Sequence, residues 1–195
     1  MQQRILVIGA GFGGLWSALS AARLLDKHGR QDVQITLLAP QAELRIRPRF
    51  YEPDVQSMFA PLDDLFEAVG VQFVQGTAER IDQQARKVGY RDASGRVAEL
   101  TYDRLVLASG SQLARPSVPG LKEYAFDVDQ IESAAQLESH LLSLRQRPAS
   151  PARNTVVVCG GGFTGIETAT EMPARLRSVL GENEDVRVII VERGE

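Results

Sequence analysis

The chain has few of the residues that build disulfides or metal centres. It contains one cysteine, Cys159, and two histidines, His28 and His140, neither of which lies in a motif. A single cysteine excludes an internal disulfide, a paired-cysteine redox centre and a cysteine metal cluster, and two isolated histidines argue against a metal site. We expect His140 to be a surface or packing residue. Cys159 lies where a strand becomes a turn and is expected to be a buried structural thiol rather than a nucleophile.

The chain also lacks a strong charge bias and a long apolar run. Its 22 basic and 25 acidic residues give a net charge of −3, which does not indicate binding to nucleic acid or to an anionic membrane surface. No apolar stretch is long enough to span a bilayer, and no signal peptide is expected, because the first residues lead directly into the first predicted strand. A cytoplasmic location is therefore expected by default. With 44% hydrophobic residues, the 195-residue chain can bury a sizeable core in one domain or two small ones.

What the sequence does contain is a glycine-rich turn close to its start. Residues 5–8 are apolar and lead into Gly9, and the segment 15–25 is rich in alanine and leucine, so a buried parallel strand followed by a helix is predicted. Gly9 permits the tight bend, Gly11 lets a pyrophosphate approach the backbone, and Gly14 lets helix and strand pack closely. The N–H groups at the start of the helix would face the phosphates. This pattern predicts a dinucleotide site.

A second copy of the pattern follows in residues 154–167. Gly160, Gly162 and Gly165 have the spacing of the first three glycines and again follow a run of apolar residues. Two dinucleotide sites in one chain indicate electron transfer between two nucleotides. The alternative is one ligand site with a duplicated supporting turn.

The two copies differ at the end of the next strand. In the first copy the strand predicted over 33–38 is followed by Ala39, where an acidic residue would bind the adenosine ribose. Either Glu43 or a backbone carbonyl substitutes, or the ribose is bound more weakly. In the second copy the strand ends in Glu192, which should accept hydrogen bonds from the ribose hydroxyls and repel a 2′-phosphate. This residue favours NADH over NADPH, although the neighbouring Arg193 weakens the preference.

The remaining segments predict the elements of an α/β protein. A basic and aromatic loop over 44–53 is either a solvated surface turn or a segment that lies against a flavin, where arginines offset pyrophosphate charge. We favour the second because the loop follows a strand at the ligand-binding end of the sheet. The other predicted elements are a short helix from Pro61 to about Gly70, a strand over 71–74, a three-stranded meander over 77–81, 87–91 and 96–101, a strand and turn over 102–111, a linker over 115–120, and helices over 130–144 and 163–180, the second with a kink expected at Pro173.

On these motifs the sequence resembles the two-dinucleotide-binding-domain flavoproteins, and within them the type II NADH dehydrogenases. The motifs follow the family's order over essentially the whole chain. The resemblance implies an α/β fold, with a Rossmann-like FAD-binding domain that carries a small antiparallel β-meander, followed by the start of an inserted Rossmann-like NAD-binding domain. Residues 1–115 would form the N-terminal part of the first domain, and residues 116–195 the first part of the second.

The resemblance also implies two cofactors, FAD and NADH, and the residues that hold them. Glu167 would face the region where nicotinamide and flavin stack, as a catalytic residue, or would be an exposed carboxylate that interacts favourably with the helix dipole. Arg47 and Pro48 would pass near the flavin and Ala78 near the adenine. The FAD pyrophosphate would lie on Gly9, Gly11, Phe12, Gly13 and Gly14, with Ser109, Gly110 and Ser111 closing over the cofactor, and NADH would lie on Gly160, Gly162, Gly165 and Glu192.

The implied activity is transfer of hydride from NADH to the flavin and then of electrons to a quinone or other small acceptor. The absence of cysteine from residues 40–58 argues against disulfide reduction and weakens a sulfide:quinone reading. Two alternatives stay open. One is a non-catalytic dinucleotide-binding module, which Ala39 motivates, and the other is a flavoprotein reductase for a ferredoxin-like partner.

The length departs from the family pattern. In the family the FAD domain resumes after the inserted domain, and a C-terminal segment supplies the acceptor side and membrane attachment. The present chain stops shortly after Glu192, so it resembles the N-terminal half of such an enzyme. We expect the 195 residues alone to turn over NADH poorly or not at all. The full-length protein is expected in the cytoplasm, with peripheral attachment to the inner membrane and a homodimer as possibilities.

Overall fold

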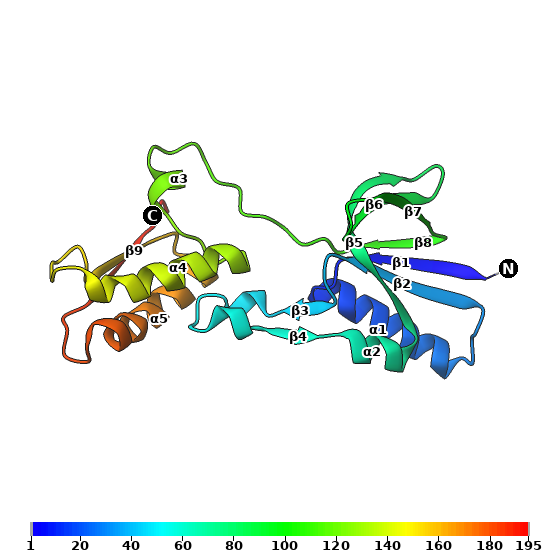
Figure 1. Cartoon of the computed structure of the whole chain (residues 1–195), viewed down its shortest axis with the longest axis horizontal. Coiled ribbons are helices and arrows are strands. Elements are labelled where there is room, and N and C mark those ends of the chain that lie inside the picture. Colours follow the sequence, from blue (N-terminus) through cyan, green and yellow to red (C-terminus); the bar gives the residue numbers. More distant parts are fainter. Residues whose placement is uncertain (1, 195) are drawn as a thin grey trace. The chain divides into compact units, whose positions relative to one another are not determined.

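The computed structural model describes residues 2–194, and it divides the chain into two compact units. Unit 1 comprises residues 2–45 and Phe59–Ser111, and unit 2 comprises Ile46–Met58 together with residues 112–194 (Figure 1). The chain therefore leaves unit 1 once for a short excursion before it leaves finally after Ser111.

Unit 1 is built on a six-stranded sheet with the order β7-β6-β5-β2-β1-β8. Four strands are parallel, with β1 between β2 and β8, and β5 beside β2. β5, β6 and β7 form the antiparallel meander. The strands are β1 (Gln3–Ile8), β2 (Val33–Ala39), β5 (Val71–Asp82), β6 (Lys87–Asp92), β7 (Val97–Thr101) and β8 (Arg104–Leu107).

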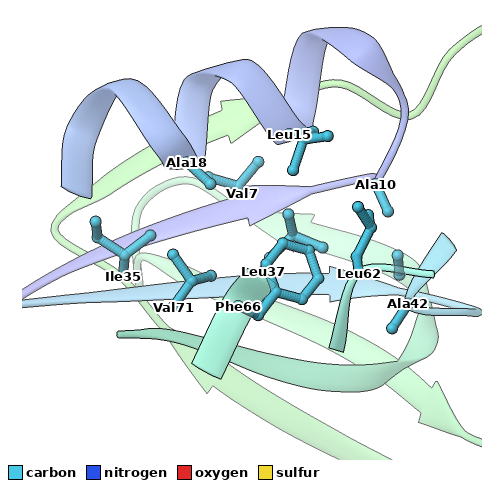
Figure 2. Close-up of a cluster of buried hydrophobic side chains, with 11 residues drawn as sticks. Val7, Ala10, Leu15, Ala18, Ile35, Leu37, Ala42, Leu62, Phe66 and Val71 are labelled. Atoms are coloured by element: carbon cyan, nitrogen blue, oxygen red, sulfur yellow. The ribbon is translucent and has the colours of Figure 1, made fainter. Parts of the chain in front are cut away.

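Apolar side chains cover both faces of the parallel strands. Helices α1 (Phe12–Lys27) and α2 (Asp63–Val69) contribute Leu15 and Phe66 to a core that includes Val7 (Figure 2). On the other face, Leu6 packs in a cluster with Val88 of the meander. Because successive residues of a strand point to opposite faces, a strand covered on both sides needs a continuous apolar run. This arrangement explains residues 5–8, and the predicted Rossmann-like unit with its meander is confirmed.

Two predicted boundaries in unit 1 are wrong. The strand over 71–74 and the first meander strand are one continuous β5, in which a bulge between Ala78 and Arg80 shifts the register. A bulge bends a strand without ending it, so one strand serves both the parallel sheet and the meander. Pro61 does not start a helix but ends β4 (Phe59–Pro61), which pairs with β3 (Glu43–Arg45), and α2 begins at Asp63.

Unit 2 contains a β-α-β segment with a second helix packed on it. The strands β9 (Thr155–Cys159) and β10 (Arg187–Val191) are parallel and are joined through α5 (Phe163–Leu180). Helix α4 (Ile131–Ser143) packs with α5 in a cluster that includes Leu141, Met172 and Leu176. The shorter elements are α3 (Leu121–Tyr124) and the 3₁₀ turns η1 (Arg47–Arg49), η2 (Val55–Ser57) and η3 (Leu144–Gln146).

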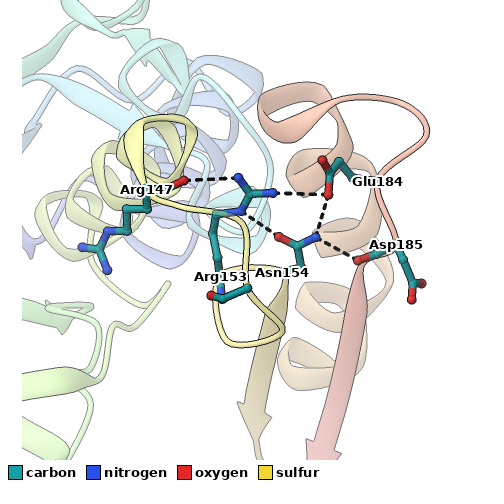
Figure 3. Close-up of polar contacts among 6 residues, drawn as sticks. Arg147, Arg153, Asn154, Glu184 and Asp185 are labelled. Carbon is teal, nitrogen blue, oxygen red and sulfur yellow. Dashed lines mark hydrogen bonds and ion pairs between the residues drawn. The ribbon is translucent and has the colours of Figure 1, made fainter.

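A polar network ties the start of β9 to the connection between α5 and β10 (Figure 3). The Arg153 guanidinium donates to the Asn154 side-chain oxygen at 2.8 Å and to Glu184 at 3.2 Å. The Asn154 amide donates to the same Glu184 carboxylate at 2.8 Å and to the Asp185 carbonyl at 3.1 Å. These contacts fix the two parallel strands at their beginning, at the end opposite to the glycine turn.

The excursion Ile46–Met58, which we call the η1–η2 loop, has its own apolar contacts in unit 2. Phe50, Val55 and Met58 are buried in a cluster with Ile131 and Ala134 of α4. Figure 1 shows the loop, in cyan, beside α4 and α5. The segment predicted to be a loop against a cofactor is thus an integral part of the unit that carries the second glycine turn.

Two predictions about single residues can be compared with unit 2. His140 packs against Phe126 with ring centroids 4.7 Å apart, so a packing role is confirmed. Cys159 is exposed rather than buried. Alternation along β9 buries Val158 and places Cys159 on the same exposed face as Val157.

Candidate nucleotide-binding sites

The first glycine turn is closed by backbone contacts that leave no room for a side chain. Gly9 has φ +103°, and a Cβ there would lie 2.2 Å from the Ala108 carbonyl oxygen. A Cβ on Gly14 would lie 1.8 Å from the Gly9 carbonyl oxygen. The Gly9 N–H donates to the Leu38 carbonyl at 2.9 Å, and the Ala108 N–H donates to the Ile8 carbonyl at 2.8 Å. Only glycine fits at positions 9 and 14.

The second turn repeats this geometry. Gly160 has φ +111°, and a Cβ on Gly165 would lie 1.9 Å from the Gly160 carbonyl oxygen. The Gly160 N–H donates to the Val191 carbonyl at 2.8 Å, as Gly9 does to Leu38 in unit 1. Both turns therefore bring the start of a helix against the end of a strand in the same way.

The middle glycine of each turn is open. A Cβ on Gly11 or on Gly162 would meet no described atom within 4 Å, and both residues have extended backbone. Each is the N-cap of its helix, α1 or α5, without a side-chain cap. The first N–H groups of these helices thus lie beside space that a Cβ would partly fill. This combination suits a pyrophosphate, because helix N-termini bind anions.

Other predicted residues of the first site lie at varying distances from the turn. The Ser109 nitrogen would lie 3.3 Å from a Cβ on Gly9, so the 109–111 turn and the glycine turn are neighbours. Phe12 is partly exposed. At Gly13 a Cβ would make an ordinary 3.8 Å contact with Ala108, so packing does not require glycine there. Ala78 packs in the hydrophobic cluster on the meander face of the sheet. Its place near the adenine stays a prediction.

Arg47 and Pro48 belong to η1 in unit 2. The Arg47 guanidinium forms an ion pair with Asp129. Burial acts to raise the pKa of the Asp129 carboxyl, but hydrogen bonds from Arg47 and Gln130 outweigh burial and hold that pKa below its usual value. The charge of Arg47 is thus shared with an ionised carboxylate, and its role toward a flavin stays a prediction.

Glu192 lies at the second glycine turn and is held there by backbone amides. Its carboxylate accepts from the N–H groups of Gly161 at 2.5 Å, Arg193 at 2.6 Å and Gly194 at 3.2 Å. These bonds lower the pKa of Glu192, the bond from Gly161 most. An ionised hydrogen-bond acceptor therefore borders the second turn.

The corresponding position in unit 1 offers no carboxylate. Ala39 is buried at the end of β2. The neighbouring Pro40 carbonyl accepts from the Gln75 side chain at 3.0 Å, and the Glu43 carboxylate lies 3.7 Å from the Arg45 guanidinium. Both groups that could replace the missing acid already have partners.

Glu167 is exposed near the start of α5, four residues before Glu171 and eight before Arg175. Sequence reasoning did not select Arg175, a buried cation on the same face of the helix, or Tyr51, whose carbonyl it binds. The four-residue spacing of two acids and an arginine was the available signal. The partner in the η1–η2 loop could not be inferred from it.

Each of the two units has a dinucleotide-type glycine turn between a parallel strand and a helix. A chain with two such turns is typical of nucleotide-dependent oxidoreductases. Residues 3–195 match the family described as pyridine nucleotide-disulphide oxidoreductase. The chain belongs to this family, and the predicted family is confirmed.

Several relatives extend this comparison. The chain is 42% identical over 195 residues to an NADH dehydrogenase-like protein of Mycobacterium tuberculosis, covering 97% of this chain and 47% of that protein. It is 34% identical over 197 residues to the demethylphylloquinone reductase of Synechocystis, covering 98% and 46%. The chain thus spans about half the length of the curated relatives it matches.

The fold is also found in solved structures. NDH2 of Plasmodium falciparum, solved in complex with NADH, superposes with a TM-score of 0.80 at 19% identity, covering 100% of this chain and 42% of that protein. The sulfide:quinone oxidoreductase of Aquifex aeolicus has a TM-score of 0.68 at 25% identity, covering 91% and 41%.

Among residues 2–194, no helix is long and apolar enough to cross a membrane.

Proposed function

We propose that the chain binds FAD at the first glycine turn and NADH at the second, and that the protein oxidises NADH with a quinone as the electron acceptor. The observation that carries this proposal is the repetition of one arrangement, a strand and a helix packed closely at a glycine turn with an open central glycine, in two units of the same chain. One nucleotide site would serve binding alone, whereas two sites suit transfer between nucleotides.

The residues of the chain would bind and orient the two nucleotides. The open positions at Gly11 and Gly162 fit pyrophosphate groups, which the N–H groups of α1 and α5 would hold. Glu192 would accept hydrogen bonds from the ribose hydroxyls of NADH. Glu167 would lie at the nicotinamide end of the second site. The bound flavin would supply the redox chemistry, since it can take electrons from a reduced nicotinamide and pass them on.

The quinone acceptor is supported by the relatives rather than by a site in this chain. The Synechocystis relative is a demethylphylloquinone reductase, and a type II NADH:quinone oxidoreductase of Staphylococcus haemolyticus is 26% identical over 205 residues, covering 98% of this chain and 49% of that protein. The same resemblance suggests attachment to a membrane surface and a homodimer.

The direct test is the visible absorption spectrum of the purified protein before and after anaerobic addition of NADH. A flavin spectrum that bleaches with NADH is expected, because reduction of a bound flavin does not require turnover with an acceptor. Bound flavin that NADH does not bleach would contradict the proposal.

A second candidate is a non-catalytic dinucleotide-binding module. It is favoured by one observation, the buried Ala39 at the position where an acidic residue would bind the ribose of FAD. This candidate predicts a protein that stays colourless after incubation with FAD yet binds NADH at the second turn.

A further inference from the structure

The chain crosses between the two units at three places. The crossings fall between residues 45 and 46, between 58 and 59, and between 111 and 112. At the first two, the Ile46 N–H donates to the Met58 carbonyl at 2.9 Å, so the two ends of the η1–η2 loop are joined. Unit 2 therefore has two entry points, the joined ends of this loop and the start of the linker after Ser111.

The carboxylate of Asp129, two residues before α4, accepts hydrogen bonds at both entry points. The Arg47 guanidinium donates to one of its oxygens, and the two side chains form an ion pair. The Leu113 N–H donates to the other oxygen at 3.1 Å, and this oxygen also accepts from the Gln130 side chain at 3.0 Å. Arg47 and Leu113 are each the second residue of unit 2 after a crossing. One carboxylate thus binds two segments that are far apart in the sequence.

The segment that carries Asp129 is itself packed on unit 2. Phe126 packs against His140 of α4, with ring centroids 4.7 Å apart. Val128 packs against the buried cluster that the η1–η2 loop shares with α4. The Asp129 N–H donates to the Asp127 carboxylate at 3.1 Å. Asp129 is therefore held in place by its own neighbours as well as by the segments that it binds.

The linker has a second contact with the same segment. The Arg115 guanidinium forms an ion pair with Asp127, whose side chain is 11% exposed. A partly buried ion pair is screened less by salt than an exposed one. Arg115 follows Leu113 by two positions, and Asp127 precedes Asp129 by two. Two contacts at this spacing fix the direction of the linker as well as its first atoms.

We propose that Asp129 is the anchor at which unit 2 holds both entry points of the chain. The residues that stay free to change backbone conformation between the units are then limited to 45–46, 58–59 and 111–112. The anchor also gives the Arg47 guanidinium a fixed partner before any nucleotide binds. This inference goes beyond the proposed function and does not depend on it, because every contact of the anchor lies within unit 2.

The test is amide hydrogen exchange of the purified chain, measured at single residues by NMR. The Leu113 N–H reports on the linker, and the Phe50 N–H, which donates to the Arg47 carbonyl at 3.2 Å, reports on the loop. Asp129→Ala removes the acceptor from both segments, so both reporters should exchange at least about tenfold faster. Met172, which is buried in α5, should keep its wild-type rate.

Arg47→Met distinguishes a shared anchor from a linker that is held by the loop. The variant releases the loop but leaves the acceptor of the Leu113 N–H in place, so only the Phe50 reporter should exchange faster. Asp185→Ala is the matched control, because it removes an exposed aspartate of the same unit, and it should leave both reporters unchanged. Equal acceleration of both reporters in Arg47→Met would overturn the proposal.

Wild-type exchange at either reporter in folded Asp129→Ala would also overturn the proposal. So would an equal acceleration at Met172, because it would show a general loss of stability. Should Asp129→Ala not fold, Asp129→Asn replaces it. Asparagine offers one oxygen and no charge, so exchange about threefold faster at both reporters is expected, and a wild-type rate at either would overturn the proposal. Failure of NADH to bleach a bound flavin, with the exchange as expected, would contradict the proposed function and leave this inference intact.

Discussion

The two glycine turns share their backbone geometry but differ in their surroundings. In unit 1 the strand before the turn lies between two neighbours, and Ala108, which follows β8, closes over Gly9. In unit 2, within residues 2–194, β9 pairs with β10 alone, and a Cβ on Gly160 would meet no described atom within 4 Å. The positive φ and the close approach of strand and helix are therefore local properties of the motif. The contact over Gly9 is added by the rest of the sheet.

The largest effect is expected at the third glycine of a turn. Gly14→Ala places a methyl group 1.8 Å from the Gly9 carbonyl oxygen, so α1 has to move away from β1. We expect the free energy of unfolding of unit 1 to fall by about 3 kcal/mol or more. Urea unfolding followed by the fluorescence of Trp16, the single tryptophan of the chain, measures this.

The control for this variant is Gly13→Ala. Its methyl group would make an ordinary contact with Ala108, and alanine favours a helix over glycine by about 0.5–1 kcal/mol. A small gain in stability is expected. A Gly14→Ala variant as stable as Gly13→Ala would refute the tight geometry of the turn.

A smaller effect distinguishes the two turns directly. Gly9→Ala and Gly160→Ala both force an L-residue to a positive φ, which costs about 1–2 kcal/mol. Only Gly9→Ala also meets a carbonyl oxygen, at 2.2 Å, so it should destabilise its unit by at least about 1 kcal/mol more. Hydrogen exchange resolved by unit measures both. Equal losses would show that closure by Ala108 adds nothing.

The comparison also concerns the ends of the second strands, where unit 1 has Ala39 and unit 2 has Glu192. Glu192→Gln removes the charge that repels a 2′-phosphate, so we expect the preference for NADH over NADPH to fall about tenfold. Binding titrations with both nucleotides measure the preference. Glu182→Gln, an exposed acid in the same unit, should leave the preference unchanged. A preference that survives Glu192→Gln would place ribose recognition elsewhere.

The smallest predicted effect concerns Asp92, whose carboxylate accepts hydrogen bonds from Ser94 and Arg96 in the meander turn of unit 1. In the meander turn, a hydrogen bond from the Ser94 side chain is the main cause that lowers the pKa of Asp92 from 3.8 to about 2. Because the pKa is lower in the folded state, this stabilisation is complete above about pH 4 and disappears as the pH falls to about 2. Asp92→Asn should abolish that part of the pH dependence of unfolding. The same slope in wild type and variant would contradict it.

Local patterns in the sequence were sufficient for most of the elements. The apolar runs before Gly9 and Gly160 predicted buried parallel strands, and the glycine spacing predicted the two turns, because both depend on neighbours within about a dozen residues. The continuous β5 was missed because the sequence analysis ended one strand at residue 74 and began another at 77, whereas residues 75 and 76 continue the strand and its bulge lies between Ala78 and Arg80. The exposure of Cys159 was missed because the sequence does not reveal which face of β9 is covered by other elements.

Contacts between distant segments could not be predicted. Arg175 and Tyr51 are separated by 124 positions, and neither residue type signals the other. The same holds for the ion pair of Arg47 with Asp129, across 82 positions. Both contacts assign the η1–η2 loop to unit 2, whereas its place in the sequence, between two strands of unit 1, suggested the other unit. The roles of the individual site residues stay predictions.

The most direct measurement of the central claim compares Gly11→Ala with Gly162→Ala for binding of FAD and of NADH. Neither methyl group meets a described atom within 4 Å, so both variants should unfold like the wild type. Gly11→Ala should lose flavin while keeping its affinity for NADH, and Gly162→Ala should bind NADH at least about tenfold more weakly while keeping flavin. Loss of both nucleotides in one variant and of neither in the other would contradict two separate sites.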